Sequence, residues 1–246
     1  MTQDLFRSDA YLRECSATIT AITEAGLVLD RTVFYPLGGG QAGDAGVLAL
    51  ADGRTLAIAD TRKGKDAEGK PTADIVHVPA PGQEALLATL AVGTAVTARV
   101  DWERRHRLMR FHTTTHLLCH LVPQLVNGCS ITPDYARLDF NMTDALDKDA
   151  LTIGIAALVA AAHPVTVGQI TDAELDANPA LVKSMSVSPP RGSGVIRTIR
   201  VGHTDLIDLQ PCGGTHVANT AEIGAVVVTK IEKKSATTRR VVLGFA

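Results

Sequence analysis

The sequence predicts an α+β protein in which a β-rich region precedes a region of alternating helices and strands. Residues 1–100 contain short apolar segments separated by turn residues, and they contain no long amphipathic helix. From Asp101 onward, segments with helical spacing alternate with strand-like segments. This order predicts a small β-barrel or β-sandwich-like domain in residues 1–100. It predicts a second domain in residues 101–246, with helices packed on one face of an antiparallel sheet.

Paired strand signals define the first region. Segments 18–22 and 27–30 flank a turn at Gly26, and segments 46–50 and 55–60 flank the stronger turn signal Asp52-Gly53. The remaining expected elements are strands at 75–78 and 94–100, a short helix within 83–90, and an exposed charged loop at 62–74.

A long helix opens the second region. Asp101 is a suitable N-cap for a helix over 102–122, and Pro123 ends it. A second helix is expected over 148–162, before Pro164. Strands are expected at 135–140, 165–170, 195–201, 224–232 and 239–245.

Composition limits the classes of partner. The net charge is −2 and the pI is about 6.4, so contact with nucleic acid would have to come from local patches. Five arginines against two acids lie between Arg99 and Arg110, and five basic residues against one acid lie between Lys230 and Arg240. Each patch alone is more often an ordinary solvated surface than a phosphate-binding site. No apolar run is long enough to span a membrane, and the N-terminus lacks an apolar signal core. We therefore expect a cytoplasmic protein without a membrane partner.

Two short motifs carry metal-binding side chains. In 112-HTTTHLL-118, His112 and His116 are four residues apart on the expected helix, so both imidazoles share one face. In 212-CGGTHV-217, two glycines favour a turn that presents Cys212 and His216. Three imidazoles and one thiolate form a donor set suited to zinc. The sequence therefore predicts one zinc ion per chain, bound where the fold brings the two motifs together.

Other interpretations of these motifs remain open. Either motif alone is more often a pair of ordinary side chains than a metal site. His120 continues the face of His112 and His116 and is a rival ligand, whereas Cys119 lies on an adjacent face. A metalloprotease is excluded, because its HExxH motif requires glutamate where this chain has Thr113. The four cysteines show no disulfide pattern, which favours free thiols or metal ligands.

The two motifs together resemble the editing domain of alanyl-tRNA synthetase and its free-standing relatives, the alanyl-tRNA editing proteins. The related second additional domain of threonyl-tRNA synthetase shares the two-part pattern. The similarity extends to 128-GCSITPDYARLDF-140, to 216-HVANTAEIG-224 and to the glycine-rich 34-FYPLGGGQAGDAG-46, which is similar to the medium-length free-standing type. It covers the chain from about Phe34 to Phe245.

The resemblance implies a fold and an activity. The fold would be a small β-barrel followed by a two-layer α/β editing domain with a zinc site. The activity would be hydrolysis, in trans, of alanine tRNA mischarged with serine or glycine. The expected partner is the acceptor end of that tRNA, with no DNA and a monomeric chain. Two alternatives remain: a zinc-stapled, non-catalytic RNA-binding module, and a zinc hydrolase for another small ester or amide.

The resemblance also suggests where substrate binds. Residues from Asn127 to Ser130 would line the amino-acid pocket, and Thr114, Thr115, Cys129 and Ser130 are candidates to meet the serine hydroxyl. Cys129 stands where relatives often carry serine, and a thiol is the weaker hydrogen-bonding group. In the glycine-rich stretch, Gly39, Gln41 and Asp44 are candidate contacts to the tRNA end. The alternative is a tight loop of the first domain.

The reaction expected from the resemblance is the hydrolysis of an ester, which needs an activated water and stabilisation of a developing oxyanion. Four protein ligands would fill a tetrahedral zinc. We therefore expect zinc to hold the site in shape or to orient substrate. The sequence leaves open whether it also activates water.

Overall fold

The computed structural model describes residues 1–189 and 194–246 and divides into two compact units. The first unit comprises Met1–Gly38 and Ala42–His106, and the second comprises Gly39–Gln41 and Arg107–Ala246. The three residues Gly39–Gln41 thus belong to the second unit, although the chain on either side of them belongs to the first.

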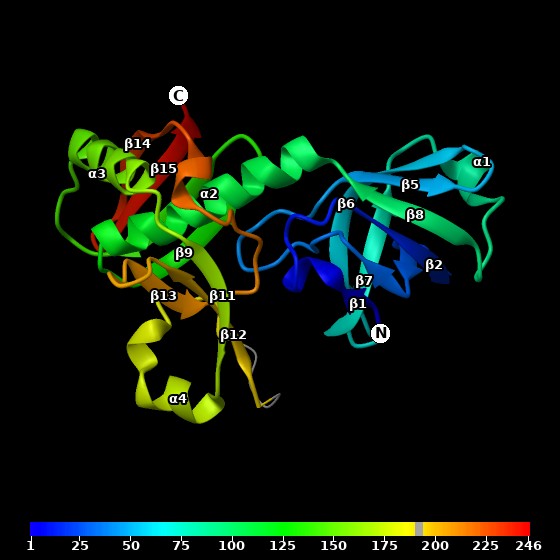
Figure 1. Cartoon of the computed structure of the whole chain (residues 1–246), viewed down its shortest axis with the longest axis horizontal. Helices are drawn as coiled ribbons and strands as arrows, with labels where there is room; N and C mark the ends of the chain where they lie inside the picture. Colours follow the sequence, from blue (N-terminus) through cyan, green and yellow to red (C-terminus); the bar gives the residue numbers. More distant parts are fainter. Residues whose placement is uncertain (190–193) are drawn as a thin grey trace. The chain divides into compact units, whose positions relative to one another are not determined.

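Six strands of the first unit form a closed ring in which every strand pairs with two neighbours. The order is β2-β3-β7-β6-β5-β8, and all six pairings are antiparallel. Closure leaves no free strand edge in the ring. The bounds are β2 (Glu14–Thr23), β3 (Gly26–Leu29), β5 (Gly46–Leu50), β6 (Thr55–Lys65), β7 (Pro71–Pro79) and β8 (Ala95–Val100) (Figure 1). Smaller elements are β1 (Gln3–Asp4), η1 (Leu5–Arg7), β4 (Arg31–Thr32) and α1 (Glu84–Leu87).

Along the strands of the ring, side chains alternate between inward and outward positions, and the inward apolar side chains form the core. In β8, Val96, Ala98 and Val100 are buried and their neighbours face outward. The exposed loop expected at 62–74 was wrong in extent, because β6 and β7 extend through most of it and leave only 66–70 as the turn. Charged side chains at the exposed ends of these strands made the segment resemble a loop.

His77 of β7 is a fully buried polar group inside the first unit. Its Nδ1 lies 3.2 Å from the carbonyl oxygen of Leu27, and its Nε2 lies 2.8 Å from Oγ1 of Thr32. A carbonyl only accepts, so Nδ1 carries the proton and Nε2 accepts from the threonine hydroxyl. Burial lowers the pKa of His77 to about 4, which keeps the ring neutral at physiological pH.

Acidification is therefore expected to destabilise the protein through His77. Between pH 6.5 and pH 4 the unfolded chain binds a proton that the folded chain excludes. The free energy of unfolding therefore keeps the full contribution of neutral His77 above pH 6.5, and it falls by about 2–3 kcal/mol by pH 4.5. Denaturant unfolding at pH 7.5 and 4.5 should show a smaller pH-dependent loss in His77→Gln than in the unsubstituted chain. An equal loss in both proteins would show that another group carries the effect.

The second unit contains two antiparallel sheets. One is four-stranded in the order β14-β15-β10-β9, and the other is three-stranded in the order β11-β12-β13. The expectation of a single sheet was wrong, because β11, β12 and β13 pair only with one another among the described residues. The strands are β9 (Val126–Ile131), β10 (Ala136–Asn141), β11 (Val165–Ile170), β12 (Ile196–Val201), β13 (Asp208–Pro211), β14 (Val226–Ser235) and β15 (Thr238–Phe245). The helices are α2 (Trp102–Leu121), α3 (Lys148–Ala160), α4 (Asp172–Ala177), η2 (Pro179–Leu181) and η3 (Thr220–Ile223).

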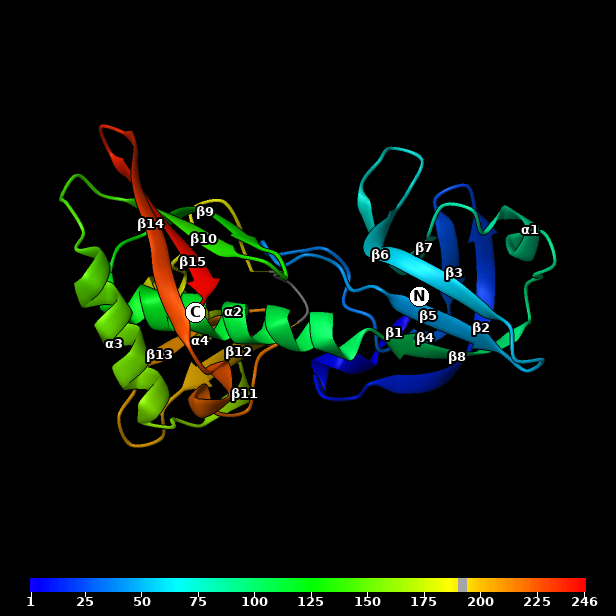
Figure 2. The same cartoon turned by 90° about the horizontal axis from the view of Figure 1, so that it is seen from above.

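The two long helices differ in their surroundings. Helix α3 packs beside β14 and η3, as Figures 1 and 2 both show, and it exposes one flank. Helix α2 is capped by the Asp101 carboxylate, which accepts from the backbone N–H of Arg104. It ends at Leu121, before Pro123. None of the helices in the described part of the chain is both long and apolar enough to span a membrane.

Helix α2 is buried on every face from Phe111 to Cys119, although this stretch includes histidines and threonines. Buried polar groups are costly unless they have partners. The threonine hydroxyls find partners within the helix, because each donates a hydrogen bond to a backbone carbonyl one turn earlier. His112 and His116 cannot do this, so their partners come from other segments.

Candidate metal centre

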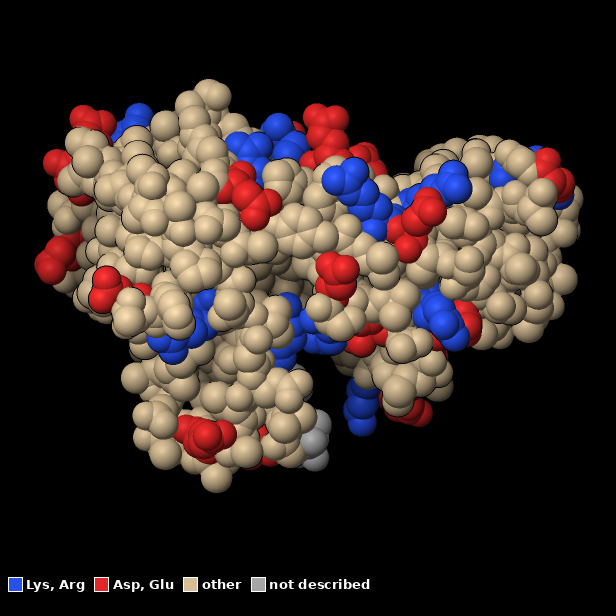
Figure 3. Space-filling view, viewed as in Figure 1, with Lys and Arg blue, Asp and Glu red and all other residues tan. Residues whose placement is uncertain are grey.

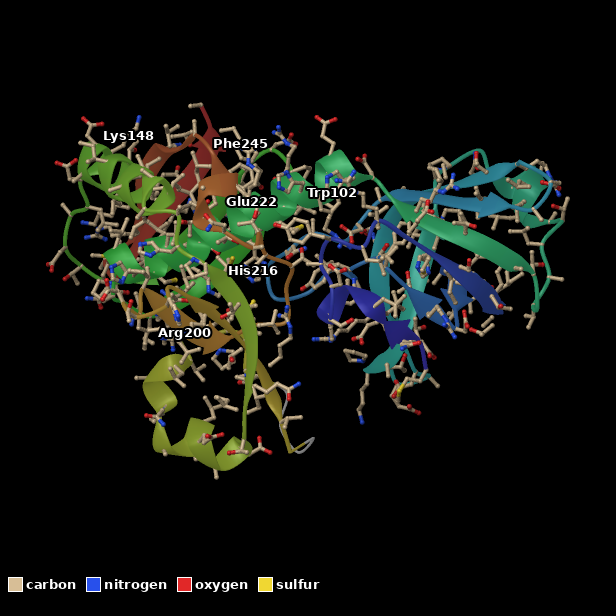
Figure 4. The ribbon with its side chains drawn as sticks, in the orientation of Figure 1. Trp102, Lys148, Arg200, His216, Glu222 and Phe245 are labelled. Atoms are coloured by element: carbon tan, nitrogen blue, oxygen red, sulfur yellow. The ribbon has the colours of Figure 1, made fainter. Side chains whose placement is uncertain are left out.

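Four side chains from two distant segments meet in the second unit. His112 and His116 project from α2, and Cys212 and His216 follow β13. Their ligand atoms all lie within 4.8 Å of one another. The Cys212 Sγ lies 3.5 Å from Nε2 of His112 and 3.3 Å from Nε2 of His216. The three imidazoles are about 95% buried, and Figure 4 shows His216 beside α2. The structure thus brings together the four ligands expected from the sequence, and the group can hold a metal ion. His120 is exposed, and Cys119 is buried outside the group.

The Nδ1 atom of each imidazole, which points away from the other ligand atoms, has a specific hydrogen-bond acceptor. Nδ1 of His112 lies 2.7 Å from Oε1 of Gln41, and Nδ1 of His116 lies 2.7 Å from Oδ2 of Asp208. An amide oxygen and a carboxylate oxygen both accept, so each Nδ1 carries the proton. Each Nε2 then keeps its lone pair for a metal, and such outer partners fix ring orientation and strengthen the ligand.

Thr113 completes the same arrangement for the third imidazole. Its hydroxyl donates to the carbonyl of Met109 at 3.0 Å and so remains an acceptor for Nδ1 of His216 at 3.2 Å. The backbone N–H of Val217 also donates to this hydroxyl, at 3.2 Å. The residue that excluded a metalloprotease motif therefore orients His216.

Gln41 is fully buried and is itself fixed at both ends of its amide. Its Nε2 donates to Oγ1 of Thr215 at 2.9 Å, and its Oε1 accepts from the Thr215 N–H at 3.1 Å. Because the backbone N–H must meet an acceptor, the amide orientation is determined. Gly40 precedes Gln41 with φ +85°, and a Cβ there would lie 2.9 Å from Cys129 Sγ. Glycine is needed for this segment to pass over β9, where the Gly40 carbonyl accepts from Ile131.

Asp208 connects His116 to Lys183 and Gln210. One carboxylate oxygen accepts from His116 and from Gln210 Nε2, at 2.9 Å for Gln210, and the other forms an ion pair with Lys183. Burial opposes ionisation, but hydrogen bonds from His116 and Lys183 lower the pKa of Asp208 to about 2. Burial likewise opposes protonation of His116, but its hydrogen bond to Asp208 raises the pKa of His116 to about 9. Sequence reasoning missed Asp208; the only signal was an acid within the apolar segment 206-LIDLQP-211.

Electrostatics favour the ligand forms of Cys212 and His216, whereas the raised pKa of His116 favours its protonated form, from which a metal would have to displace the proton. Although burial alone would raise it, the pKa of Cys212 is held well below its usual value by His112 and His216. Burial, together with the charge of His112, lowers the pKa of His216 to about 3. Metals bind the thiolate and the neutral imidazole, so the directions at Cys212 and His216 suit a metal site.

The CGG turn is shaped by backbone contacts and by the absence of a side chain. Arg197 Nη1 donates to the carbonyls of Cys212 and Gly214, at 2.6 and 3.1 Å. A Cβ on Gly214 would overlap the His112 ring and lie 2.9 Å from Gln41 Oε1. The second glycine of the motif therefore leaves space for a metal ligand.

Gly214→Ala is expected to weaken metal retention by at least about tenfold, because the new methyl group must displace His112 or its Gln41 acceptor. Metal content under chelator competition measures the effect. Gly38→Ala is the matched control, because a Cβ there meets atoms only at 3.6 Å or beyond. Retention equal to that of the control would show that His112 does not require this space.

The expected substrate residues lie in different environments. Thr115 is buried, and its hydroxyl donates to the His112 carbonyl. Cys129 lies against Gly40, and burial raises the pKa of its thiol to about 12. Asn127 donates to Thr238 Oγ1 at 3.3 Å, and Ser130 is half-buried on the same strand, β9.

The glycine-rich stretch divides between the two units. Gly39 and Gln41 belong to the second unit, whereas Asp44 belongs to the first. Asp44 is buried, and its carboxylate accepts from Arg105 and from the backbone N–H of Tyr35. The structure therefore shows internal partners for Gln41 and for Asp44.

Comparison with protein families defines the class to which this fold and site belong. Residues 196–242, which include Cys212 and His216, match the family described as the threonyl and alanyl tRNA synthetase second additional domain. Residues 9–104 match the family of class II (A) tRNA synthetases. The protein is thus of the class related to the additional domains of these synthetases.

Full-length relatives define the family more closely. The alanyl-tRNA editing protein AlaX-M of Saccharolobus solfataricus is 30% identical over 98% of both chains. The AlaX-M of Methanosarcina mazei is 31% identical over 98% of this chain and 95% of its own. An alanine–tRNA ligase from Metallosphaera sedula is 35% identical over 94% of this chain but only 25% of the ligase. The chain belongs to the alanyl-tRNA editing protein family, as its sequence motifs indicated.

Proposed function

We propose that this protein hydrolyses, in trans, the ester bond of alanine tRNA mischarged with serine or glycine. The observation that carries the proposal is the His3Cys group, in which the three imidazoles are buried and each is oriented by its own acceptor. The similarity to editing proteins over nearly the whole chain supports the same activity. In this proposal the β-barrel domain is 1–100 and the editing domain is 101–246.

Zinc is the metal that the donors fit best. Three imidazole nitrogens and one thiolate are typical zinc ligands, and the preference of Cys212 for the thiolate supports the assignment. When bound, zinc would supply a fixed positive charge that holds the site in shape and polarises substrate oxygens. His112, His116, Cys212 and His216 hold it, while Gln41, Asp208 and Thr113 keep the three imidazoles aimed.

Selection of serine over alanine requires polar groups that are left unpaired when alanine binds. The candidates are Thr115, Asn127, Cys129 and Ser130. The hydroxyl of Thr115 already donates to the His112 carbonyl, so toward a substrate it would act as an acceptor. The Cys129 thiol stays protonated, since burial raises its pKa to about 12, and it would act as a weak donor.

A second function is favoured by the ligand count. Four protein ligands fill a tetrahedral zinc, which is the arrangement of structural zinc sites. A zinc-stapled RNA-binding module without catalysis would have the same ligands and the same orienting contacts.

One assay separates these functions. The purified protein is incubated with alanine tRNA carrying serine, glycine or alanine, and release of the amino acid is followed. We expect rapid release of serine or glycine and slow release of alanine. Binding of tRNA without release of any amino acid would favour the non-catalytic module.

A further inference from the structure

The arginine-rich start of α2 contains two arginines, Arg107 and Arg110, whose terminal Nη nitrogens have no acceptor among the described residues. Three of the five arginines between Arg99 and Arg110 are held within the first unit: Arg99 pairs with Glu14, Arg105 with Asp44, and Arg104 donates to the Gly43 carbonyl. The other two, Arg107 and Arg110, have no acidic partner among the described residues.

In the second basic stretch, from Lys230 to Arg240, most basic side chains form ion pairs or donate hydrogen bonds within the protein. Lys230 pairs with Glu232, and Arg240 pairs with Asp139. Arg239 is buried and donates to backbone carbonyls. Within the described part of the chain, Lys233 and Lys234 are the exposed lysines of this stretch that form no ion pair with a carboxylate. Figure 3 shows Lys and Arg interspersed with Asp and Glu on the visible face, so no broad field of one sign is present there.

Arg107 and Arg110 lie one turn apart on α2 and converge on one aromatic ring. Their guanidinium carbons lie 4.5 and 4.0 Å from the ring centroid of Phe245, the last residue of β15. Phe245 in turn packs on Phe111 of α2, with centroids 4.1 Å apart. Figure 4 shows Phe245 at the end of its strand beside α2. Arginine stacked on an aromatic ring is held in a defined plane.

Each guanidinium is also fixed through its Nε. Arg107 Nε donates to the Pro133 carbonyl, and Arg110 Nε donates to the Ile223 carbonyl, both at 2.7 Å. Gly224 leaves space beside Arg110, because a Cβ there would lie 3.1 Å from Nη2. The Nη groups of both arginines have no protein acceptor among the described residues and are not buried. Burial and the like charge of Arg107 lower the pKa of Arg110, so the pair repel each other.

We propose that Arg107 and Arg110, supported by Phe245, bind the phosphate backbone of RNA. Two fixed guanidiniums with open Nη groups match the forked geometry by which arginine binds phosphate oxygens. An anion between them would remove their mutual repulsion. Phe245 is already in contact with Phe111 and both guanidiniums, so we assign it to holding the arginines and not to stacking a base. The contact is therefore independent of base sequence. That the RNA is a tRNA rests on the proposed function.

The test is binding of uncharged alanine tRNA to the full chain at several salt concentrations. Each lost phosphate contact reduces the slope of log K against log salt by roughly 0.7–0.9. The double variant Arg107→Gln/Arg110→Gln should reduce the slope by about 1.5 and weaken binding at least about tenfold at low salt. The variant Arg107→Lys/Arg110→Lys keeps the charges and should retain most of the slope. Both double variants lose the same two Nε hydrogen bonds, so their thermal unfolding should be lowered to a similar extent, and their metal content should match that of the unsubstituted protein.

The matched control is Lys233→Gln/Lys234→Gln, which removes the same charge from exposed lysines. A salt slope unchanged in the arginine variant, or reduced equally in the lysine control, would overturn the proposal. With mischarged tRNA the arginine variant should raise KM and leave kcat within about twofold. If the unsubstituted protein binds tRNA but releases no amino acid, the proposed function fails while the binding experiment still tests this surface.

Discussion

Under the proposed function, replacing Cys212 with alanine is expected to prevent zinc binding and to nearly abolish deacylation of mischarged tRNA. Cys212 Sγ lies within 3.5 Å of two imidazole nitrogens, and it is the only thiol of the four-donor group. Its loss leaves three neutral donors and no anionic ligand. Loss of an outer partner of a metal ligand costs roughly 10–100-fold in affinity or activity, so loss of the ligand itself should exceed that range. Zinc per chain and initial deacylation rates measure the two effects.

Cys15→Ala is the matched control, because Cys15 is a half-buried thiol of the first unit, outside the metal group. It should keep both zinc and activity. Full zinc retention in Cys212→Ala would remove Cys212 from the ligand set. Zinc loss with normal deacylation would show that the metal is not needed for the reaction.

Arg105→Ala is expected to destabilise the first unit by about 3–5 kcal/mol, the largest change in folding stability that this structure suggests. Arg105 is fully buried and donates from Nε to both oxygens of Asp44, at 2.9 and 2.8 Å. Its other nitrogens donate to the carbonyls of Val33 and Ala10. Removing the guanidinium leaves the Asp44 carboxylate buried without a counter-charge. Denaturant unfolding gives the change in the free energy of unfolding.

The exposed pair Arg62–Asp60 provides the comparison. Arg62→Ala removes an ion pair whose arginine side chain is 62% exposed, and it should change stability by less than about 1 kcal/mol. The double variant Arg105→Met/Asp44→Leu removes both buried charges and should recover much of the loss. If Arg105→Ala unfolds no more readily than Arg62→Ala, the buried pair does not stabilise the fold.

Local patterns in the sequence predicted most elements, because these patterns depend on neighbouring residues. The turn at Asp52-Gly53, the cap at Asp101 and the stop at Pro123 each fix an element within a few residues. The short strand β13 and the separation of two sheets were missed. They depend on pairing between distant segments, and 208-DLQP-211 carries no alternation of its own.

The ligand group was predictable for a similar reason, since HxxxH and CGGTH spacing are visible along the chain. Its supporting contacts were not. Gln41, whose contact to tRNA stays a prediction, lies 71 residues before the imidazole that it orients. Asp208 stands 92 residues after its partner. No spacing rule links residues so far apart, and each contact exists only after folding. The arginine-rich stretch shows the opposite case, because its five arginines look alike in the sequence but have at least three different environments in the fold.

Gly39–Gln41 has a practical consequence for anyone who tries to dissect this protein. A fragment expressed from Arg107 onward would retain all four metal ligands and every strand of its two sheets. It would still lack the acceptor for Nδ1 of His112 and the backbone carbonyl that meets Ile131. Such a fragment would contain all four metal ligands, but the imidazole of His112 would lack the hydrogen bond that orients it. A weak metal affinity measured on the fragment would therefore reflect the truncation and not the intact protein.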